Sequence, residues 1–333
     1  MRLQKAAYYT GSFVGIIRAF ARAHCDNDIH AKTDRVMDQL KVLLIKGLLH
    51  LSALLPLSVA RGMGRLVGRL YWPLGGRSRK VTLHNIRAVF PEMSDAEQSA
   101  LARRSLIATA ETAAEMGHVW IRPWSKLSQL VKEVHGTQLI TNALKEGRGV
   151  VALAPHFGNW EVMGLHLGSL GKTVSLYSPP TLEALGPIIE KSRRGSGATL
   201  VPTTSRGLAK LLKSVKAGTI SGILPDQVPP DVNAGENSLF MGIPCFTGTL
   251  ACNIIRRTGA LAVFGSAQRV PGGFVVRYEL ADPEIYDEDT AVSLAALNRG
   301  VETCLRRCVE QYQWEYKRFR VRPSDGPGFY DDM

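Results

Sequence analysis

The amino-acid sequence predicts an α/β fold: a largely parallel central sheet flanked by helices, with an N-terminal membrane-associated helix. Three observations predict it. Short apolar runs alternate with amphipathic segments from residue 132 onward, a long apolar run lies well before them, and a basic cluster follows that run. Strands that alternate with helices are typical of a sheet joined by crossover connections. The chain of 333 residues is long enough for one large domain with appendages.

Residues 1–34 are expected to form a variable N-terminal extension or a peripheral helix. Ala21-Arg22-Ala23 is similar to a signal-peptide cleavage site, and Arg2 supplies a basic start. The run between them is only modestly apolar and contains Arg18. We therefore do not expect a cleaved signal peptide.

Residues 35–80 are expected to contain the membrane-associated helix and a basic segment. The apolar run from Val42 to Ala60 is about long enough to span a bilayer. Lys46 and Pro56 oppose a spanning helix, because a charge near the bilayer centre costs a few kcal/mol. A spanning helix, a shallow interfacial helix and a soluble core helix all stay open, and a membrane role in one of the first two forms is favoured.

A basic cluster follows this run, with no acidic residue between positions 61 and 91. Its members are Arg61, Arg65, Arg69, Arg77, Arg79, Lys80 and Arg87. Directly after an apolar segment, such a cluster is typical of an anchor on anionic lipid at the cytoplasmic face, although a solvated basic surface is the alternative. The next domain is therefore expected on the cytoplasmic face of the cell inner membrane.

The net charge of +12 indicates an anionic partner: nucleic acid, acidic lipid headgroups or an acidic carrier protein. No pattern of a nucleic-acid-binding module is present, so nucleic acid is not expected as a partner. The five cysteines form neither a disulfide framework nor a metal motif, which fits reduced thiols in a cytosol. No metal and no cofactor are expected.

The α/β domain is expected over residues 81–321. Ser94-Asp95-Ala96-Glu97 is a capping box that opens a long helix to about Trp120. Candidate strands then span 149–154, 173–177, 199–202, 219–224, 260–268 and 273–280. Candidate helices span 136–146, 160–170, 182–193, 204–216, 247–258 and 291–316. The Pro- and Gly-rich residues 322–333 are expected to be a loose tail.

One stretch, from Gly149 to Glu161, holds the candidate catalytic residues. An apolar strand ends at Pro155, a tight turn follows, and Asn159 is a good N-cap for the next helix. His156 should therefore lie at the carboxyl end of a strand, and Glu161 in the first turn of a helix. In open α/β sheets, the crevice at that edge is where ligands bind.

This pair of side chains suits acid–base chemistry. Histidine is the usual general base near neutral pH, and a carboxylate on its other ring nitrogen fixes the tautomer. Glu161 is expected to fold back across the turn towards His156. On spacing alone, a structural interpretation fits as well as the catalytic one. In it His156 is a core histidine, and Glu161 interacts favourably with the dipole at the start of the helix.

The hexapeptide from His156 to Glu161, after a Gly-Val-Val strand, resembles the His-x-x-x-x-Asp/Glu box of the lipid A biosynthesis acyltransferases, within the lysophospholipid acyltransferase group. The resemblance covers about residues 40–318, and no other motif in it is specific. Its further points are Asn85 to Pro91, Arg193-Arg194-Gly195, Asp226-Gln227 and Phe240 to Thr249.

The resemblance implies that His156 is the catalytic base and Glu161 its acidic partner. It also implies substrate-binding roles, which we assign to Asn159, Arg193, Arg194, Asp226 and Gln227. Among the two arginines, Arg194 is expected to matter more. For Arg193 and Arg194 the alternative is a basic helix end that interacts favourably with the helix dipole. For Asp226 and Gln227 it is a loop acid that accepts backbone hydrogen bonds.

One departure from the family's pattern concerns a cation. Where the family often has Tyr-Arg-Pro, this chain has Tyr177-Ser178-Pro179. A phosphorylated substrate would then depend on Arg193 and Arg194. The departure leaves the acceptor and the donor open.

The expected reaction moves a fatty acyl group from an acyl carrier protein thioester, or from acyl-CoA, to a hydroxyl of a phosphorylated lipid A precursor. No Gly-x-Ser-x-Gly elbow is present, so direct transfer without an acyl-serine is expected. Two alternatives stay open. One is an acyltransferase for a lysophospholipid, a glycolipid or an amino-acid lipid. The other is a non-enzymatic membrane lipid-binding protein with the same fold.

Overall fold

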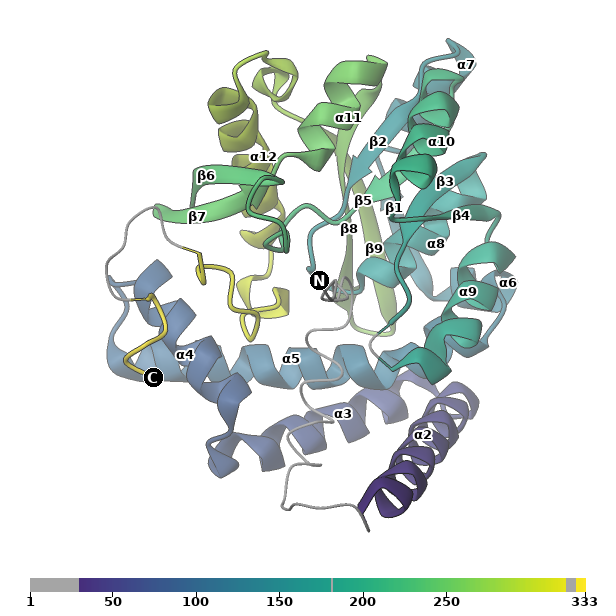
Figure 1. Cartoon of the computed structure of the whole chain (residues 1–333). Helices are drawn as coiled ribbons and strands as arrows, with labels where there is room; N and C mark the ends of the chain where they lie inside the picture. Colours follow the sequence, from purple (N-terminus) through teal and green to yellow (C-terminus); the bar gives the residue numbers. More distant parts are fainter. Residues whose placement is uncertain (1–29, 181, 322–327) are drawn as a thin grey trace.

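The computed structural model describes residues 30–180, 182–321 and 328–333, and side chains from residue 40 onward within them. Its first four helices form a layer beneath the rest of the molecule (Figure 1). They are α2 (His30–Leu54), α3 (Leu57–Tyr71), α4 (Arg77–Val89) and α5 (Asp95–Ile121). The predicted capping box at the start of α5 is confirmed: Ser94 Oγ accepts a hydrogen bond from the Glu97 N–H, and the Glu97 carboxylate accepts one from the Ser94 N–H.

A seven-stranded sheet stands on this helical layer, in the order β1-β9-β8-β2-β5-β3-β4 (Figure 1). The strands are β1 (Val131–His135), β2 (Val150–Leu153), β3 (Thr173–Tyr177), β4 (Ala198–Pro202), β5 (Ile220–Ile223), β8 (Leu261–Val270) and β9 (Gly273–Leu280). Neighbours pair in parallel, except that β8 and β9 are antiparallel. The expected mixed α/β fold with a mostly parallel sheet is confirmed.

Helices cover both faces of the sheet, so its central strand β2 is buried on both sides. Val151 and Leu153 belong to one hydrophobic core, and Val150 and Ala152 to the other. The first core includes side chains of α10 (Ser205–Lys216), α11 (Leu250–Thr258) and α12 (Thr290–Leu305), and the second those of α7 (Thr137–Lys145), α8 (Trp160–Leu170) and α9 (Gly186–Gly195). Because both faces of β2 are buried, its sequence is a continuous apolar run instead of an alternation of apolar and polar residues.

The expected single run from Val42 to Ala60 is divided in the structure. Pro56, with φ −56°, stands at the N-cap of α3 and separates it from α2. Within the described part of the chain, no helix has the length and apolar character needed to cross a membrane. The spanning form of the expected membrane helix is therefore not supported.

Helix α3 packs closely along α5 through two glycines. A Cβ added to Gly64 would lie 2.7 Å from the Ala110 carbonyl oxygen, and one added to Gly68 would lie 2.7 Å from Ile107 Cα. Any larger residue at either position would push the helices apart. The layer beneath the sheet is thus a tightly packed support.

The predicted helix over residues 291–316 is wrong beyond Leu305. Helix α12 ends there, and the chain continues through the short 3₁₀ helix η5 (Val309–Gln311) into an extended segment. The Gly158 N–H donates to the Gln311 carbonyl, and the Gln313 N–H donates to the His156 carbonyl. A helix would use these backbone groups internally, so the long-range pairing with the loop after β2 replaces it.

The hairpin of β6 (Gly235–Phe240) and β7 (Ile243–Gly248) was not predicted, and α11 begins at Leu250 rather than at residue 247. The two turn residues of the hairpin, Met241 and Gly242, have φ values of 51° and 76°. Such turns favour Asn-Gly or Asp-Gly, so a methionine in the first position concealed the hairpin. The Met241 N–H donates to Glu302 Oε1 at 2.7 Å.

The end of the chain differs from the expected loose tail where it is described. Residues 322–327 lie outside the described residues, but Tyr330 is buried and donates a hydrogen bond to Asn85 Oδ1 at 2.8 Å. Asn85 in turn donates to the carbonyls of Trp314 and Tyr316. The sequence predicts no role for Asn85. In the structure this residue joins α4 to the C-terminal segment.

Candidate active site

The register of two neighbouring strands brings His156 and Asp226 together. Strands β2 and β5 pair in parallel with Leu153 opposite Ile223, and the two side chains follow three residues after those positions. His156 Nδ1–H donates to Asp226 Oδ1 at 2.8 Å, and the His156 backbone N–H donates to Oδ2 at 2.9 Å. Both residues are buried. One carboxylate thus holds both the ring and the backbone of His156.

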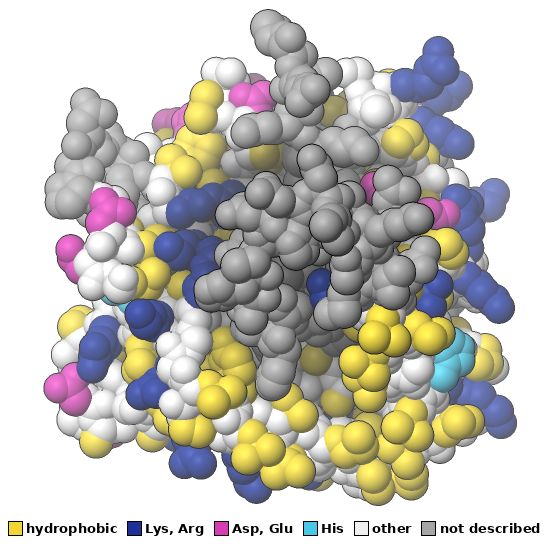
Figure 2. All heavy atoms as spheres, turned by 60° about the horizontal axis from the view of Figure 1, so that its bottom comes forward, with side chains coloured by type: hydrophobic (Ala, Val, Ile, Leu, Met, Phe, Trp, Pro, Cys, Tyr) yellow, Lys and Arg dark blue, Asp and Glu magenta, His cyan; other side chains and the backbone are white. Residues whose placement is uncertain are grey.

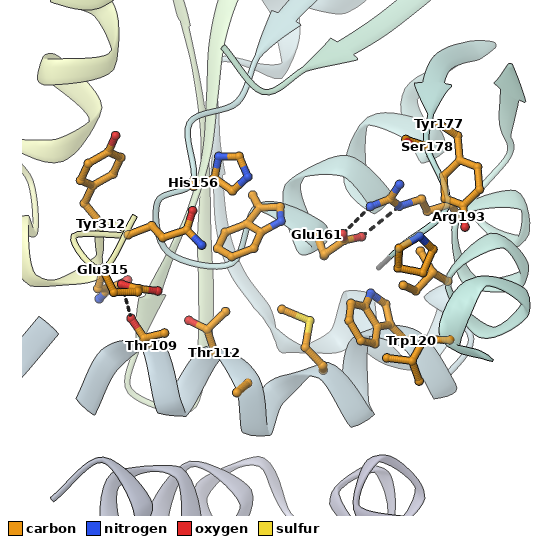
Figure 3. A pocket seen from close by; sticks show the side chains of 18 residues that line it. Thr109, Thr112, Trp120, His156, Glu161, Tyr177, Ser178, Arg193, Tyr312 and Glu315 are labelled. Atoms are coloured by element: carbon orange, nitrogen blue, oxygen red, sulfur yellow. Dashed lines mark hydrogen bonds and ion pairs between the residues drawn. The ribbon is translucent and has the colours of Figure 1, made fainter. Parts of the chain in front are cut away.

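The expected pairing of Glu161 with His156 is therefore corrected. Glu161 instead accepts two hydrogen bonds from Arg193 of α9, at 3.2 Å to Oε2 and 2.5 Å to Oε1 (Figure 3). The reason is the geometry of α8: its first turn directs Glu161 towards α9, and the ring of Trp160 lies against His156 with centroids 5.0 Å apart. The sequence predicts Glu161 as the partner of one His156 ring nitrogen; in the structure Asp226 binds that nitrogen, Nδ1.

The hydrogen bonds around His156 select the tautomer that a general base needs. Gln227 Nε2 donates to His156 Nε2 at 3.2 Å and to Gln313 Oε1 at 3.1 Å. With its proton on Nδ1, the ring has its lone pair on Nε2, and here that lone pair accepts from Gln227. Asp226 and Gln227, expected to bind substrate, thus both bond to the His156 ring.

Asp226 carries the negative charge that this arrangement requires. Burial alone would raise the pKa of the carboxyl group. The adjacent His156 ring and its two hydrogen bonds outweigh burial and hold the pKa of Asp226 below its ordinary value. An ionised Asp226 stabilises the imidazolium that forms when His156 takes a proton.

Asn159 joins the start of α8 to the buried Glu115. The side chain is fully buried; Oδ1 caps α8 by accepting from the Val162 N–H at 3.2 Å, and Nδ2 donates to Glu115 Oε2 at 2.9 Å. The expected N-cap is confirmed. Both polar groups of the amide make hydrogen bonds inside the protein, and the expected substrate-binding role stays a prediction.

Glu115 of α5 lies at the centre of a buried ionic network beneath the site. Its Oε1 accepts from Arg61 Nε at 2.7 Å and from Arg269 Nε at 2.6 Å. Burial would raise the pKa of Glu115, and the two guanidinium groups hold it below its ordinary value. Arg61 is therefore part of the interior, not of the basic surface in which it was placed. This network joins α3, α5, β8 and the start of α8, and no local sequence motif marks it.

The pocket in front of His156 is lined by both polar and apolar residues. Figure 3 shows Thr109 and Glu315 on one side of His156, and Trp120 and the pair of Glu161 and Arg193 on the other. Gln313 and Ile189 also line the pocket. The remaining lining residues are Thr112, Ala113, Met116, Trp160, Tyr177, Ser178, Pro180, Leu185, Gln311 and Tyr312. The shape suits a ligand with a hydrocarbon chain and a polar part.

The two arginines of α9 lie in different surroundings. Arg193 lines the pocket, bound to Glu161, with its guanidinium 5.7 Å from the centre of the Tyr177 ring. Arg194 is half exposed and pairs with Glu190 at 3.8 Å on the surface of the same helix. Ser178 is buried in the pocket wall on the side of Arg193. The structure thus places Arg193, and not Arg194, in the pocket lining, and the expected order of the two in substrate use stays a prediction.

Comparison with known families matches residues 30–321 to the model of the bacterial lipid A biosynthesis acyltransferases. The chain belongs to this family. It is 25% identical to the lipid A biosynthesis lauroyltransferase of Escherichia coli K12 over 286 residues, which are 85% of this chain and 92% of the relative. The palmitoleoyltransferase of the same strain is 22% identical, over 85% of this chain and 92% of the relative, and its myristoyltransferase 26%, over 78% and 79%.

Membership of the lipid A biosynthesis acyltransferases confirms the resemblance drawn from the His156–Glu161 stretch. It also makes the protein an enzyme, a transferase of acyl groups. The expectation of a non-enzymatic lipid-binding protein is therefore set aside.

Proposed function

We propose that this acyltransferase moves a fatty acyl group from the thioester of acyl carrier protein to a hydroxyl of a phosphorylated lipid A precursor, with His156 as general base. The observation that carries the proposal is the His156 ring itself. Its Nδ1–H is held by Asp226, its Nε2 is the nitrogen with the lone pair, and the ring lines a pocket of polar and apolar residues. The three relatives transfer lauroyl, palmitoleoyl and myristoyl groups according to their names.

The proposed transfer is direct. His156 Nε2 takes the proton of the acceptor hydroxyl as its oxygen attacks the thioester carbonyl carbon, and the carbonyl electron pair moves onto oxygen. When the tetrahedral oxyanion collapses, the carbon–sulfur bond breaks and the thiolate takes the proton from His156. Asp226 offsets the imidazolium charge between these two events. The N–H groups of Trp160 and Glu161, in the first turn of α8, are suited to bind the oxyanion.

The acyl chain is assigned to the apolar residues of the pocket lining. These include Met116, Trp120, Leu185 and Ile189. Burying a hydrocarbon chain against them is favourable by about 0.8 kcal/mol per methylene group. The polar lining residues then surround the reacting groups.

The donor assignment rests on charge. Acyl carrier protein is acidic, and a chain with a net charge of +12 attracts an acidic partner. Acyl-CoA, which also carries negative charge, is the competing donor. The phosphates of the acceptor are a second use for the same positive charge.

Purified enzyme tests the proposal. It should be incubated with acyl carrier protein or CoA thioesters and with either a phosphorylated lipid A precursor or a lysophospholipid, and the products weighed by mass spectrometry. We expect one acyl group to be added to the lipid A precursor from the carrier protein. Transfer only to the lysophospholipid would contradict the proposed acceptor, and transfer only from CoA the proposed donor.

Another lipid acceptor is the second candidate, and Ser178 favours it. The serine stands in the pocket wall where the family often has an arginine, so one cation that could bind phosphate is missing. A glycolipid without phosphate would not need it, and a lysophospholipid would need a cation only for its single headgroup phosphate. The same incubation decides between the two acceptors.

The arginines give the first prediction. Arg193→Ala should lower kcat/KM by about 10- to 100-fold, because a charge-assisted contact contributes about 1.5–3 kcal/mol and Glu161 would lose its partner. Arg194→Ala is the matched control on the same helix and should change kcat/KM less than about twofold, because its side chain is half exposed outside the pocket. Steady-state kinetics on both variants measures this. A larger loss in Arg194→Ala would restore the order expected from the sequence.

We also propose that α2 and α3 lie on an anionic membrane surface, at the cytoplasmic face of the inner membrane. Figure 2 shows apolar side chains spread over this face, with basic ones around them. The exposed apolar residues of the two helices include Leu43, Leu48, Leu51, Leu54, Leu66 and Leu70. An apolar surface beside basic side chains is the pattern of an interfacial segment on anionic lipid.

The membrane proposal predicts the effect of two charges. Leu66→Glu with Leu70→Glu should weaken binding to phosphatidylglycerol vesicles by more than about tenfold, because each leucine contributes about 1.5–3 kcal/mol when buried in the interface. The control is the same change at two exposed apolar residues outside these helices, Val232 and Leu280. Vesicle co-sedimentation at low and high salt measures binding. Equal binding by both double variants would rule out α3 as the contact.

A further inference from the structure

Glu315 is an ionisable group of the pocket for which the proposed transfer has no use. The residue lies in a turn after η5, and it lines the same pocket as His156 (Figure 3). The Thr109 hydroxyl of α5 donates to Oε2 at 3.2 Å. Oε1 is shielded from solvent and has no hydrogen-bond partner within the described residues. A buried oxygen of this kind requires an explanation, and a bound substrate is one.

We propose that Glu315 acts as a neutral carboxylic acid that donates a hydrogen bond to the thioester carbonyl oxygen as negative charge develops on it. The inference rests on the acyl transfer proposed above. His156 and Glu315 border one pocket, so the carbonyl group that reacts beside Nε2 lies within a space that both residues line. A protonated carboxyl group donates a short and strong hydrogen bond to an anionic oxygen. Unlike a carboxylate, it carries no negative charge that would repel that oxygen.

The surroundings of Glu315 favour the neutral form. Burial raises the pKa of the Glu315 carboxyl to about 7, against its own backbone N–H, the hydrogen bond from Thr109 and the charge of His156, which lower it. The other charged groups around the pocket are paired: Glu161 with Arg193, Asp226 with His156, and Glu115 with Arg61 and Arg269. No lysine or arginine is bonded to the Glu315 carboxylate within the described residues.

The sign of the pH dependence follows from this assignment. A donor proton is present below a pKa of about 7 and is lost as pH rises through it. The kcat/KM of the wild type should therefore fall on the alkaline side.

Three variants test the inference. Glu315→Ala should lower kcat by about 10²–10³-fold with little change in KM, the cost of removing one oxyanion donor. Glu315→Gln keeps an N–H donor at every pH, so it should retain activity within about tenfold and lose the alkaline limb. Thr109→Val removes a hydrogen bond that favours ionised Glu315, so the alkaline limb should move to higher pH. Thr109→Ser keeps the hydroxyl group and is the control.

A structural readout accompanies the kinetics. The infrared carbonyl band of a protonated carboxyl group should be present in the wild type at mildly acidic pH, disappear as pH rises, and be absent in Glu315→Gln. If the wild type transfers acyl groups while Glu315→Ala matches its kcat and pH profile, this inference is overturned and the proposed function stands. A Glu315→Ala variant with raised KM and unchanged kcat would also overturn it, because the contact would then be made equally in the ground state. If the wild type transfers no acyl group, the proposed function fails.

Discussion

Replacing His156 with alanine is expected to abolish acyl transfer and leave the fold intact. Loss of a general base costs about 10²–10⁴-fold in kcat, and loss of the pair that it forms with Asp226 costs more. The side chain is buried at the pocket wall and does not belong to either hydrophobic core, so the fold should tolerate its removal. Single-turnover transfer with a radiolabelled acyl donor measures the effect, and circular dichroism checks the fold.

The control for this variant is His135→Ala. His135 is exposed on β1, where its ring bonds to Glu133, and neither residue lines the pocket. That variant should keep wild-type turnover. Turnover in His156→Ala within tenfold of the wild type would remove His156 from the chemistry, and the pocket would then be only a binding site.

Replacing Asp226 with asparagine is expected to reduce kcat by about 10⁴-fold. The amide has nearly the same shape, but its N–H₂ group competes with the His156 Nδ1–H for the role of donor. The ring can then place its proton on Nε2, where it can no longer take a proton from the acceptor hydroxyl. Rapid-quench kinetics measures kcat, and the imidazole nitrogen chemical shifts measured by NMR report the tautomer.

Glu161→Gln is the matched control. Like Asp226→Asn, it replaces one oxygen of a buried carboxylate of the site with an amide nitrogen. The sequence alone predicts a severe effect for it, since Glu161 is there the partner of His156. In the structure Glu161 holds Arg193 instead, so we expect a loss of about 10- to 100-fold, the size of one charge-assisted contact. A greater loss in Glu161→Gln than in Asp226→Asn would show that the carboxylates exchange roles when substrate binds.

Local signals in the sequence determined the elements around the site. Helix α8 has the bounds expected from the sequence, because Asn159 caps its start and Gly171 follows its end. Strand β3 also has its expected bounds, and the capping box fixes the start of α5. These features depend on residues within a few positions of one another. For the same reason His156 could be placed at the end of a strand without knowledge of the fold.

Only the tertiary structure decided which carboxylate His156 meets. Asp226 is 70 residues away in the chain, and the pairing depends on β5 lying beside β2 in register. A single sequence contains no signal for strand order, so the nearest acid, Glu161, was the natural choice. The Glu115 network and the role of Glu315 are likewise hidden, because each joins segments more than 40 residues apart. Backbone pairing between residues 156–158 and 311–313 also ended α12 early, since a long-range contact overrides the helical pattern of a local stretch.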